Sequence, residues 1–132
     1  MSAPEETRPV NVIPEIIEQS EELKTWRRHI HAHPELAFEE HDTAAFVAEK
    51  LRSFGIEVHE GMAGTGVIGT LSRGGGNRAI GLRADLDALP IVEANQFEHV
   101  SKNPGIMHAC GHDGHTCMLL GAAAYLAKAD TF

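Results

Sequence analysis

The chain has 132 residues, a formal net charge of −8 at pH 7 and hydrophobic residues at 42% of its positions. This length suffices for one domain with an apolar core, and the apolar content excludes a disordered chain or a disulfide-bonded miniprotein. The acidic balance argues against nucleic acid and against an anionic membrane as partners. Because we find no signal peptide and the two cysteines make no disulfide framework, we expect a soluble protein of the reducing cytoplasm.

The first half of the chain shows helical periodicity after a polar start. We expect residues 1–11 to form a flexible tail and residues 12–132 to form one unit. A helix that begins at Pro14 should end near Ala32, because the next residue precedes a proline. A second helix should span residues 42–54, with Gly55 as its left-handed cap. The apolar residues that recur at helical spacing in these two segments are Ile13, Ile16, Ile17, Leu23, Trp26, Ile30, Ala44, Val47, Leu51 and Phe54.

From residue 56 onward the pattern changes to short apolar runs between glycine-rich turns. Residues 56–58, 67–71 and 79–84 are expected strands, the last two joined by a hairpin loop at 73–77. Residues 93–105 should be irregular, and an apolar helix should follow over residues 116–127. The predicted fold class is therefore α/β, with a mixed sheet and helices packed on it.

The segment Met107-His-Ala-Cys-Gly-His-Asp-Gly-His-Thr116 concentrates the chemistry of the chain. It holds three of the nine histidines, whose number is the one compositional hint of metal or acid–base chemistry. Cys110 and His112 carry side chains that bind zinc-like ions, and one short loop can supply both. They could equally be a buried thiol and a hydrogen-bonded loop histidine. A catalytic ion needs at least three protein ligands, so this loop alone cannot complete a site.

Two aspartates follow the expected strand at 79–84, where sites form in open α/β sheets. Asp85 and Asp87 could meet a metal or substrate there, or they could merely cap a turn. A carboxylate beside a metal-bound histidine normally orients the second ring nitrogen, which makes Asp87 a candidate for that role.

The remaining polar residues near the loop have plain structural interpretations beside the functional ones. His108 and His115 are expected to support the site indirectly or to be structural. Asp113 is either a ligand or, like Thr116, the cap of the following helix. Cys117 should be a small core residue, because its neighbours are apolar. The alternating histidines at 29, 31 and 33 are interpreted as a solvated helix end with one hydrogen-bonded histidine.

Taken together, residues 27–36, 81–90 and 101–116 resemble the aminoacylase/carboxypeptidase superfamily of metal-dependent amidohydrolases. The closest branch contains hippurate hydrolase, N-acyl-amino-acid amidohydrolases and plant auxin-conjugate hydrolases. The three segments stand in the expected order, and the resemblance covers nearly everything from residue 13 onward. It implies the N-terminal portion of a zinc-exopeptidase-like catalytic domain.

The resemblance implies a site with two divalent ions, with Mn, Zn, Co or Ni as alternatives. Cys110 and His112 match the first two metal ligands of the family, and Asp87 matches its active-site aspartate. Asp85 stands where other branches carry a ligating histidine, so its role stays open. The implied reaction is metal-assisted hydrolysis of the amide bond in an N-acyl amino acid or similar conjugate, with a glutamate as general base.

The chain departs from the family because relatives carry that glutamate, further ligands and a lid or dimerisation domain downstream. No Glu-Glu pair follows Cys110 here. We therefore expect a fragment of a homo-oligomeric enzyme that is inactive alone. The alternative is a non-catalytic metal-binding or interaction fragment. A redox protein that uses Cys110 and Cys117 is disfavoured, because their spacing is not Cys-x-x-Cys.

Overall fold

In a computed structural model, residues 11–132 are described, and they begin with two helices that are almost continuous. Helix α1 spans Pro14–Glu18 and helix α2 spans Ser20–Ala32, with Gln19 between them. The expected end at Ala32 is confirmed, because His33 leaves the helical region before Pro34. The predicted tail at residues 1–11 lies outside the described residues except for Asn11.

Helix α3 spans His41–Ser53 and ends, as predicted, at a glycine with positive φ, Gly55 at 77°. Its first turn is capped by a side chain from outside the helix. The Glu35 carboxylate accepts hydrogen bonds from the backbone N–H groups of Asp42 at 2.9 Å and Thr43 at 2.7 Å. These two donors have no partner within the helix, so the carboxylate satisfies them and also suits the positive end of the helix dipole.

A two-stranded antiparallel hairpin follows, with β1 at Glu57–Met62 and β2 at Gly66–Thr70. Its register pairs Glu57 with Thr70 and Glu60 with Val67, and an irregularity interrupts the pairing after Glu60. The first strand is longer than the three residues predicted from its apolar pattern. Backbone hydrogen bonding to β2, rather than side-chain burial, sustains that extra length, since most of β1 is exposed.

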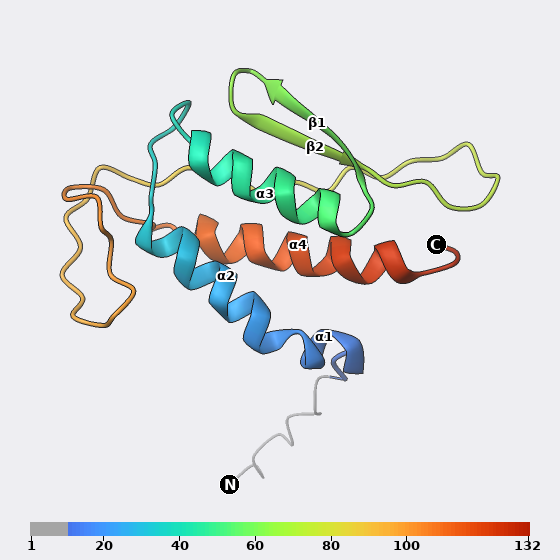
Figure 1. The fold of residues 1–132 in the computed structure, drawn as a ribbon, viewed down its shortest axis with the longest axis horizontal. Helices are drawn as coiled ribbons and strands as arrows, with labels where there is room; N and C mark the ends of the chain where they lie inside the picture. Colours follow the sequence, from blue (N-terminus) through green and yellow to red (C-terminus); the bar gives the residue numbers. More distant parts are fainter. Residues whose placement is uncertain (1–10) are drawn as a thin grey trace, which may run out of the picture.

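The last helix, α4, spans His112–Lys128 and lies at the centre of the packing. In Figure 1, α3 lies between the hairpin and α4, and α2 packs on α4 from the other side. Helix α4 begins four residues earlier than predicted. The residue before it is Gly111, in the left-handed region at φ 94°, and no side chain caps the helix. The predicted caps, Asp113 and Thr116, are wrong because both residues lie inside the helix.

The core forms where these three helices meet the base of the hairpin. Leu120 and Ile30 are each only 2% exposed, and Cys117 is buried among them, which confirms its predicted core position. The stripes predicted over residues 23–30 and 44–54 therefore point to the same interior. The prediction is wrong for Ile13 and Ile17, which are 43% and 56% exposed. The buried core cluster consists of Trp26, Ile30, Val47, Leu51, Ile56, Cys117 and Leu120.

The predicted strand at 79–84 is wrong, and so is the hairpin loop at 73–77. Among the described residues, no strand forms between β2 and α4. Ile80 is 88% exposed and Leu82 is 61% exposed. The alternating apolar residues do not form a strand here, because no neighbouring strand pairs with them. The α/β class itself is confirmed, with helices packed on a sheet. The predicted mixed sheet is present only in part. Among the described residues, β1 and β2 pair antiparallel, and the parallel pairing consists of one bridge between Leu36 and Ala88.

The long connection from residue 71 to 111, yellow to orange in Figure 1, carries the candidate site without regular helix or strand. Two isolated bridges hold it: Leu36 with Ala88, and Leu89 with Met107. Residues 93–105 are irregular, as expected. Within residues 11–132, no helix is long and apolar enough to cross a membrane.

Candidate functional site

His112 and Asp87 come together although 25 residues separate them. His112 is the first residue of α4, and its Nδ1 lies 3.0 Å from Asp87 Oδ1 and 2.9 Å from the Asp87 backbone oxygen. Both neighbours of Nδ1 are acceptors, so Nδ1 carries the hydrogen and Nε2 keeps its lone pair when the ring is neutral. This is the arrangement that prepares a histidine to bind a metal through Nε2.

Asp85 lies on the other side of the same imidazole. Its Oδ2 is 4.0 Å from His112 Nε2, while its Oδ1 accepts a hydrogen bond from Arg83 Nε at 2.8 Å. The backbone oxygen of Asp85 also accepts a hydrogen bond from the Thr116 hydroxyl at 3.2 Å. The first turns of α4 therefore hold the two aspartates on opposite sides of one histidine.

Cys110 is exposed, two residues before the helix, and neither cysteine forms a disulfide. Gly111 separates it from His112 and turns the chain through a positive φ. That conformation favours glycine because a side chain would crowd the backbone there. By contrast, burial raises the pKa of the Cys117 thiol to about 12, and the nearby Asp113 carboxylate adds to the effect. Only the Cys110 thiol is thus available for ligand chemistry.

His108 is 4% exposed, and neither of its ring nitrogens has a hydrogen-bond partner among the described residues. Burial lowers its pKa, and the neighbouring His31 and His112 act in the same direction. A buried imidazole normally has partners, so this one is prepared for a group that these residues do not provide. His115 is exposed, with its ring centroid 5.7 Å from that of His112.

The structure also brings together three largely buried side chains that sequence reasoning did not connect. His31 Nδ1 lies 2.8 Å from Asp113 Oδ2, and His31 Nε2 lies 2.9 Å from Glu93 Oε1. The Asp113 side chain is 1% exposed, that of Glu93 3%, and that of His31 11%. Arg27 adds a positive charge, with its Nε 3.5 Å from Asp113 Oδ2. We call these three residues, His31, Glu93 and Asp113, the His31 bridge.

The charges of the His31 bridge reinforce one another. Burial opposes protonation of His31, but the hydrogen bonds to Glu93 and Asp113 outweigh it and raise the histidine pKa. Burial likewise acts to raise the pKa of Glu93, but hydrogen bonds from His31, Asn95 and the Ser101 backbone hold it at about 2. The pKa of Asp113 is lowered, because His31 and the Gly114 N–H outweigh its burial. These pKa shifts all favour an imidazolium between two carboxylates.

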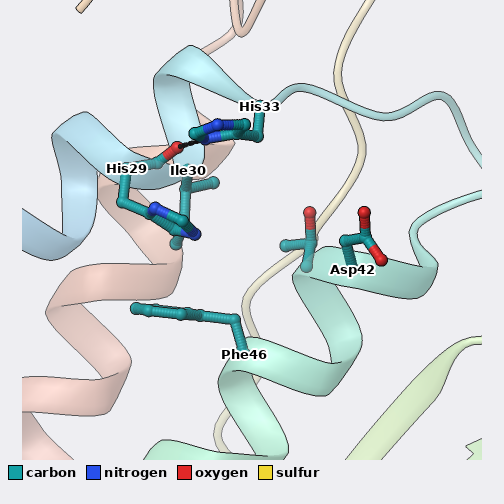
Figure 2. A pocket seen from close by; sticks show the side chains of 6 residues that line it. His29, Ile30, His33, Asp42 and Phe46 are labelled. Carbon is teal, nitrogen blue, oxygen red and sulfur yellow. Dashed lines mark hydrogen bonds between the residues drawn. The ribbon is translucent and has the colours of Figure 1, made fainter.

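His29 of α2 and His33, which directly follows that helix, line a small pocket. Figure 2 shows these two histidines above Phe46 and Asp42 of α3. The His29 ring stacks on Phe46 at 4.9 Å between centroids, and His33 Nδ1 is 2.7 Å from the His29 backbone oxygen. Burial lowers the pKa of His29, and His33 adds to this. The interpretation of a solvated helix end with one hydrogen-bonded histidine is wrong, because His31 is buried in its bridge and His33 is hydrogen-bonded as well.

The residues present fit part of a metal site. Cys110 and His112 offer sulfur and nitrogen donors of the kind that bind zinc-like ions, and Asp87 already orients the imidazole. The unpartnered nitrogens of His108 lie in the same segment. Within residues 11–132, no three His, Cys, Asp or Glu side chains are grouped so that they could hold an ion together. The loop thus carries a partial donor set.

Comparison with known proteins places this segment. Residues 81–132, which contain both aspartates and the whole loop, match the profile of Peptidase family M20/M25/M40. This part of the chain is similar to that family. The resemblance inferred from the sequence is therefore confirmed.

Two relatives with hydrolase names match most of the chain. A hippurate hydrolase of Campylobacter jejuni is 52% identical over 119 residues, which are 90% of this chain and 31% of that protein. An N-acyl-L-amino acid amidohydrolase of Geobacillus stearothermophilus is 56% identical over 107 residues, which are 78% of this chain and 29% of that protein. The chain therefore spans about a third of the length of these two relatives.

The fold agrees with a solved member of the M20 family. A Bacillus subtilis protein, described as a dinuclear metal-binding peptidase of this family, superposes with a TM-score of 0.81 at 38% identity. The match covers 85% of this chain and 32% of that protein. The arrangement of α2, α3, α4 and the hairpin is thus an arrangement found in M20 proteins.

Proposed function

We propose that the protein containing this chain is a metal-dependent amidohydrolase that cleaves the amide bond of N-acyl amino acids or similar conjugates. The observation that carries the proposal is the Asp87–His112 contact of 3.0 Å, beside Cys110 at the N-terminus of α4. The hydrolase names of the relatives support the substrate class. We propose residues 12–132 as the N-terminal part of the catalytic domain.

Each residue has a distinct proposed role. Cys110 Sγ and His112 Nε2 would hold a divalent ion, with Mn, Zn, Co and Ni as the candidates and two ions in the complete site. Such an ion supplies a Lewis acid that polarises the amide carbonyl and activates water. Asp87 fixes the tautomer and direction of His112, and as the family's active-site aspartate it would face the reacting groups. The glutamate that acts as general base is proposed to lie in another part of the protein, because no glutamate follows Cys110 in these residues.

The remaining candidates are assigned by their surroundings. Asp85 is proposed as a carboxylate on the metal side of His112, because its Oδ2 is the acidic oxygen near Nε2. His108, buried without a partner, is proposed to hydrogen-bond a group of the complete site. Asp113 is proposed as a structural carboxylate, since its oxygens are occupied by His31 and the Gly114 N–H. His115, exposed on the first turn of α4, remains a second neighbour of His112.

The expected partners follow the same reasoning. We propose a small-molecule substrate, no nucleic acid and no membrane partner, in agreement with the charge of −8. We propose a cytoplasmic location, because an exposed free thiol at Cys110 suits a reducing compartment. A homo-oligomeric complete enzyme is also proposed, on the resemblance alone.

The test uses Cys110→Ser and His112→Ala in the full-length protein. We expect both variants to lose bound metal and hydrolysis of N-acyl amino acids, because each removes a donor from an already small set. Metal content is measured by mass spectrometry and turnover on hippurate and N-acetyl amino acids. His59→Ala, an exposed histidine in β1, is the matched control and should retain both.

Two results would contradict the proposal in different ways. Full metal occupancy with unchanged turnover in either variant would overturn the ligand assignment. Metal binding by the wild-type protein without turnover on any amide would favour the alternative, a non-catalytic metal-binding protein.

A further inference from the structure

We propose that His31 is a positioning residue for the metal loop, residues 107–112, which carries Cys110 and His112. It acts through Glu93 and Asp113 rather than by contact with metal or substrate. This inference rests on the proposed metal site. It concerns a residue in α2 that lies outside the segment matched by the family profile.

Geometry requires His31 to act as a double donor. A carboxylate oxygen lies at 2.8 Å from one ring nitrogen and at 2.9 Å from the other. A neutral imidazole has one donor nitrogen and one acceptor nitrogen. In a neutral ring, the lone pair of the acceptor nitrogen would therefore face a carboxylate oxygen and be repelled by it. Only the protonated ring satisfies both neighbours. Its charge then compensates two buried carboxylates, which are strongly unfavourable when unpaired.

One end of the His31 bridge fixes the start of α4. Asp113 directly follows His112, and its other oxygen accepts the Gly114 N–H at 2.8 Å. A carboxylate held in the first turn also suits the helix dipole. Because consecutive Cα atoms are about 3.8 Å apart, anchoring Asp113 to α2 restricts the backbone from which the His112 side chain leaves.

The other end fixes the segment that leads into the loop. The second oxygen of Glu93 accepts the Ser101 N–H at 2.6 Å, which closes residues 93–101 into a compact turn. Immediately afterwards, Lys102 N–H donates to the Ala32 backbone oxygen at 2.9 Å, and the Asn103 amide donates to the Pro34 oxygen at 2.7 Å. The chain is thus tied to the end of α2 both before and after Cys110.

These contacts make His31 an anchor for the direction of the metal donors, in addition to its packing. The metal loop contains Gly111 in the left-handed region, and residues 108–111 have no regular pairing. Its donors therefore depend on anchors outside the loop for their direction. Removing such supporting contacts typically reduces metal affinity about 10- to 100-fold.

The experiment measures Co²⁺ binding to the metal-free, full-length protein. Cobalt bound to a thiolate gives a charge-transfer absorption band, so the titration reports affinity and Cys110 ligation without using turnover. We expect His31→Ala to weaken Co²⁺ binding about 10- to 100-fold and to change the visible bands of the bound ion. Glu93→Gln, which keeps the His31–Asp113 contact, should weaken binding in the same direction but by less.

Two matched controls separate positioning from general destabilisation. His33→Ala alters the same helix end but not the bridge, and should leave cobalt binding unchanged. Val47→Ala destabilises the core at α3 away from the loop, and should lower thermal stability without changing the cobalt spectrum. Equal loss of affinity in Val47→Ala and His31→Ala would overturn the inference.

The outcomes also separate this inference from the proposed function. A wild-type protein without a thiolate–cobalt band would overturn the metal site itself. A wild-type band that persists with equal affinity in His31→Ala would overturn the positioning role and leave the metal site intact. If His31→Ala does not fold, unchanged cobalt affinity in Glu93→Gln overturns the positioning role instead.

Discussion

Different forces hold the two regions of the molecule: the packed helices with the hairpin, and the long connection at residues 71–111. In the first region, apolar side chains from three helices meet in one buried cluster. In the second, no helix or strand forms, and polar groups far apart in sequence hold the backbone in place. Most candidate site residues lie in the second region or at its junction with α4. The site is thus placed by polar contacts on a scaffold that apolar contacts stabilise.

The difference separates stability from function in this molecule. Loss of an apolar contact in the helices should lower the stability of the whole chain, because the core is shared. Loss of a polar contact in the connection should instead misplace donors while the core remains. Each of the following changes tests that separation.

The largest expected effect is on the core. Leu120→Ala removes a side chain that is 2% exposed at the centre of α4. We expect a loss of about 2–5 kcal/mol in the free energy of unfolding, from lost burial and the cavity left behind. Urea unfolding followed by the Trp26 fluorescence measures it. Met118→Ala, on the exposed side of the same helix at 64%, is the control and should cost much less. Equal losses for the two would contradict the core assignment.

This contrast also explains what the sequence predicted and what it did not. Helical spacing identified the stripes of α2 and α3, and the core position of Cys117 followed from its apolar neighbours. Local signals placed the helix ends at Ala32 and near Gly55 correctly, because proline and glycine restrict the backbone directly. These features depend on residues a few positions apart.

Features that depend on distant residues were missed. The His31 bridge joins groups separated by 82 and 62 residues, and no pattern within α2 distinguishes His31 from His29 or His33. The strand predicted at 79–84 failed for the same reason, since a strand requires a neighbour that the local pattern does not reveal. The orientation of His112 by Asp87, in contrast, was suggested by chemistry, because a metal-binding histidine needs such a partner.

The next effect is pH-dependent and belongs to the connection. The pKa of His31 is raised above 6.5, so its contribution is complete below pH 6.5 and is lost as pH rises through the folded pKa. The pKa of Glu93 falls from 4.5 to about 2, so its contribution is complete above pH 4.5 and is lost toward pH 2. We therefore expect the His31 bridge to stabilise most between pH 4.5 and 6.5.

The measurement is the urea midpoint against pH for wild type and Glu93→Gln. Wild type should lose more stability than Glu93→Gln between pH 4.5 and 2, because the variant has no carboxylate to protonate at that position. Parallel curves in that range would show that Glu93 does not titrate with a lowered pKa.

A smaller effect is expected at the cap of α3. Glu35→Ala leaves the N–H groups of Asp42 and Thr43 without their acceptor and should cost about 0.5–2 kcal/mol. Glu35→Gln retains an acceptor oxygen and should recover part of the loss. Chemical denaturation gives both values. Because this cap lies in the helical region, cobalt binding should stay unchanged, and a weakened cobalt complex would contradict the separation of the two regions.

The smallest expected effect on stability is at the Arg83–Asp85 ion pair, where the side chains are 88% and 44% exposed. Exposed pairs contribute about 0–1 kcal/mol, so Arg83→Ala should leave the urea midpoint nearly unchanged.

The effect of Arg83→Ala on the site should be larger than its effect on stability. Arg83 occupies Oδ1 of Asp85, whose Oδ2 is 4.0 Å from His112 Nε2. Without the Arg83 guanidinium, the Asp85 carboxylate is a stronger electron-pair donor to an ion bound at His112 Nε2. The affinity for cobalt should therefore rise. Asp85→Asn should lower it at equal stability. If neither variant changes cobalt affinity, Asp85 does not lie on the metal side of His112, and the connection supplies fewer site residues than proposed.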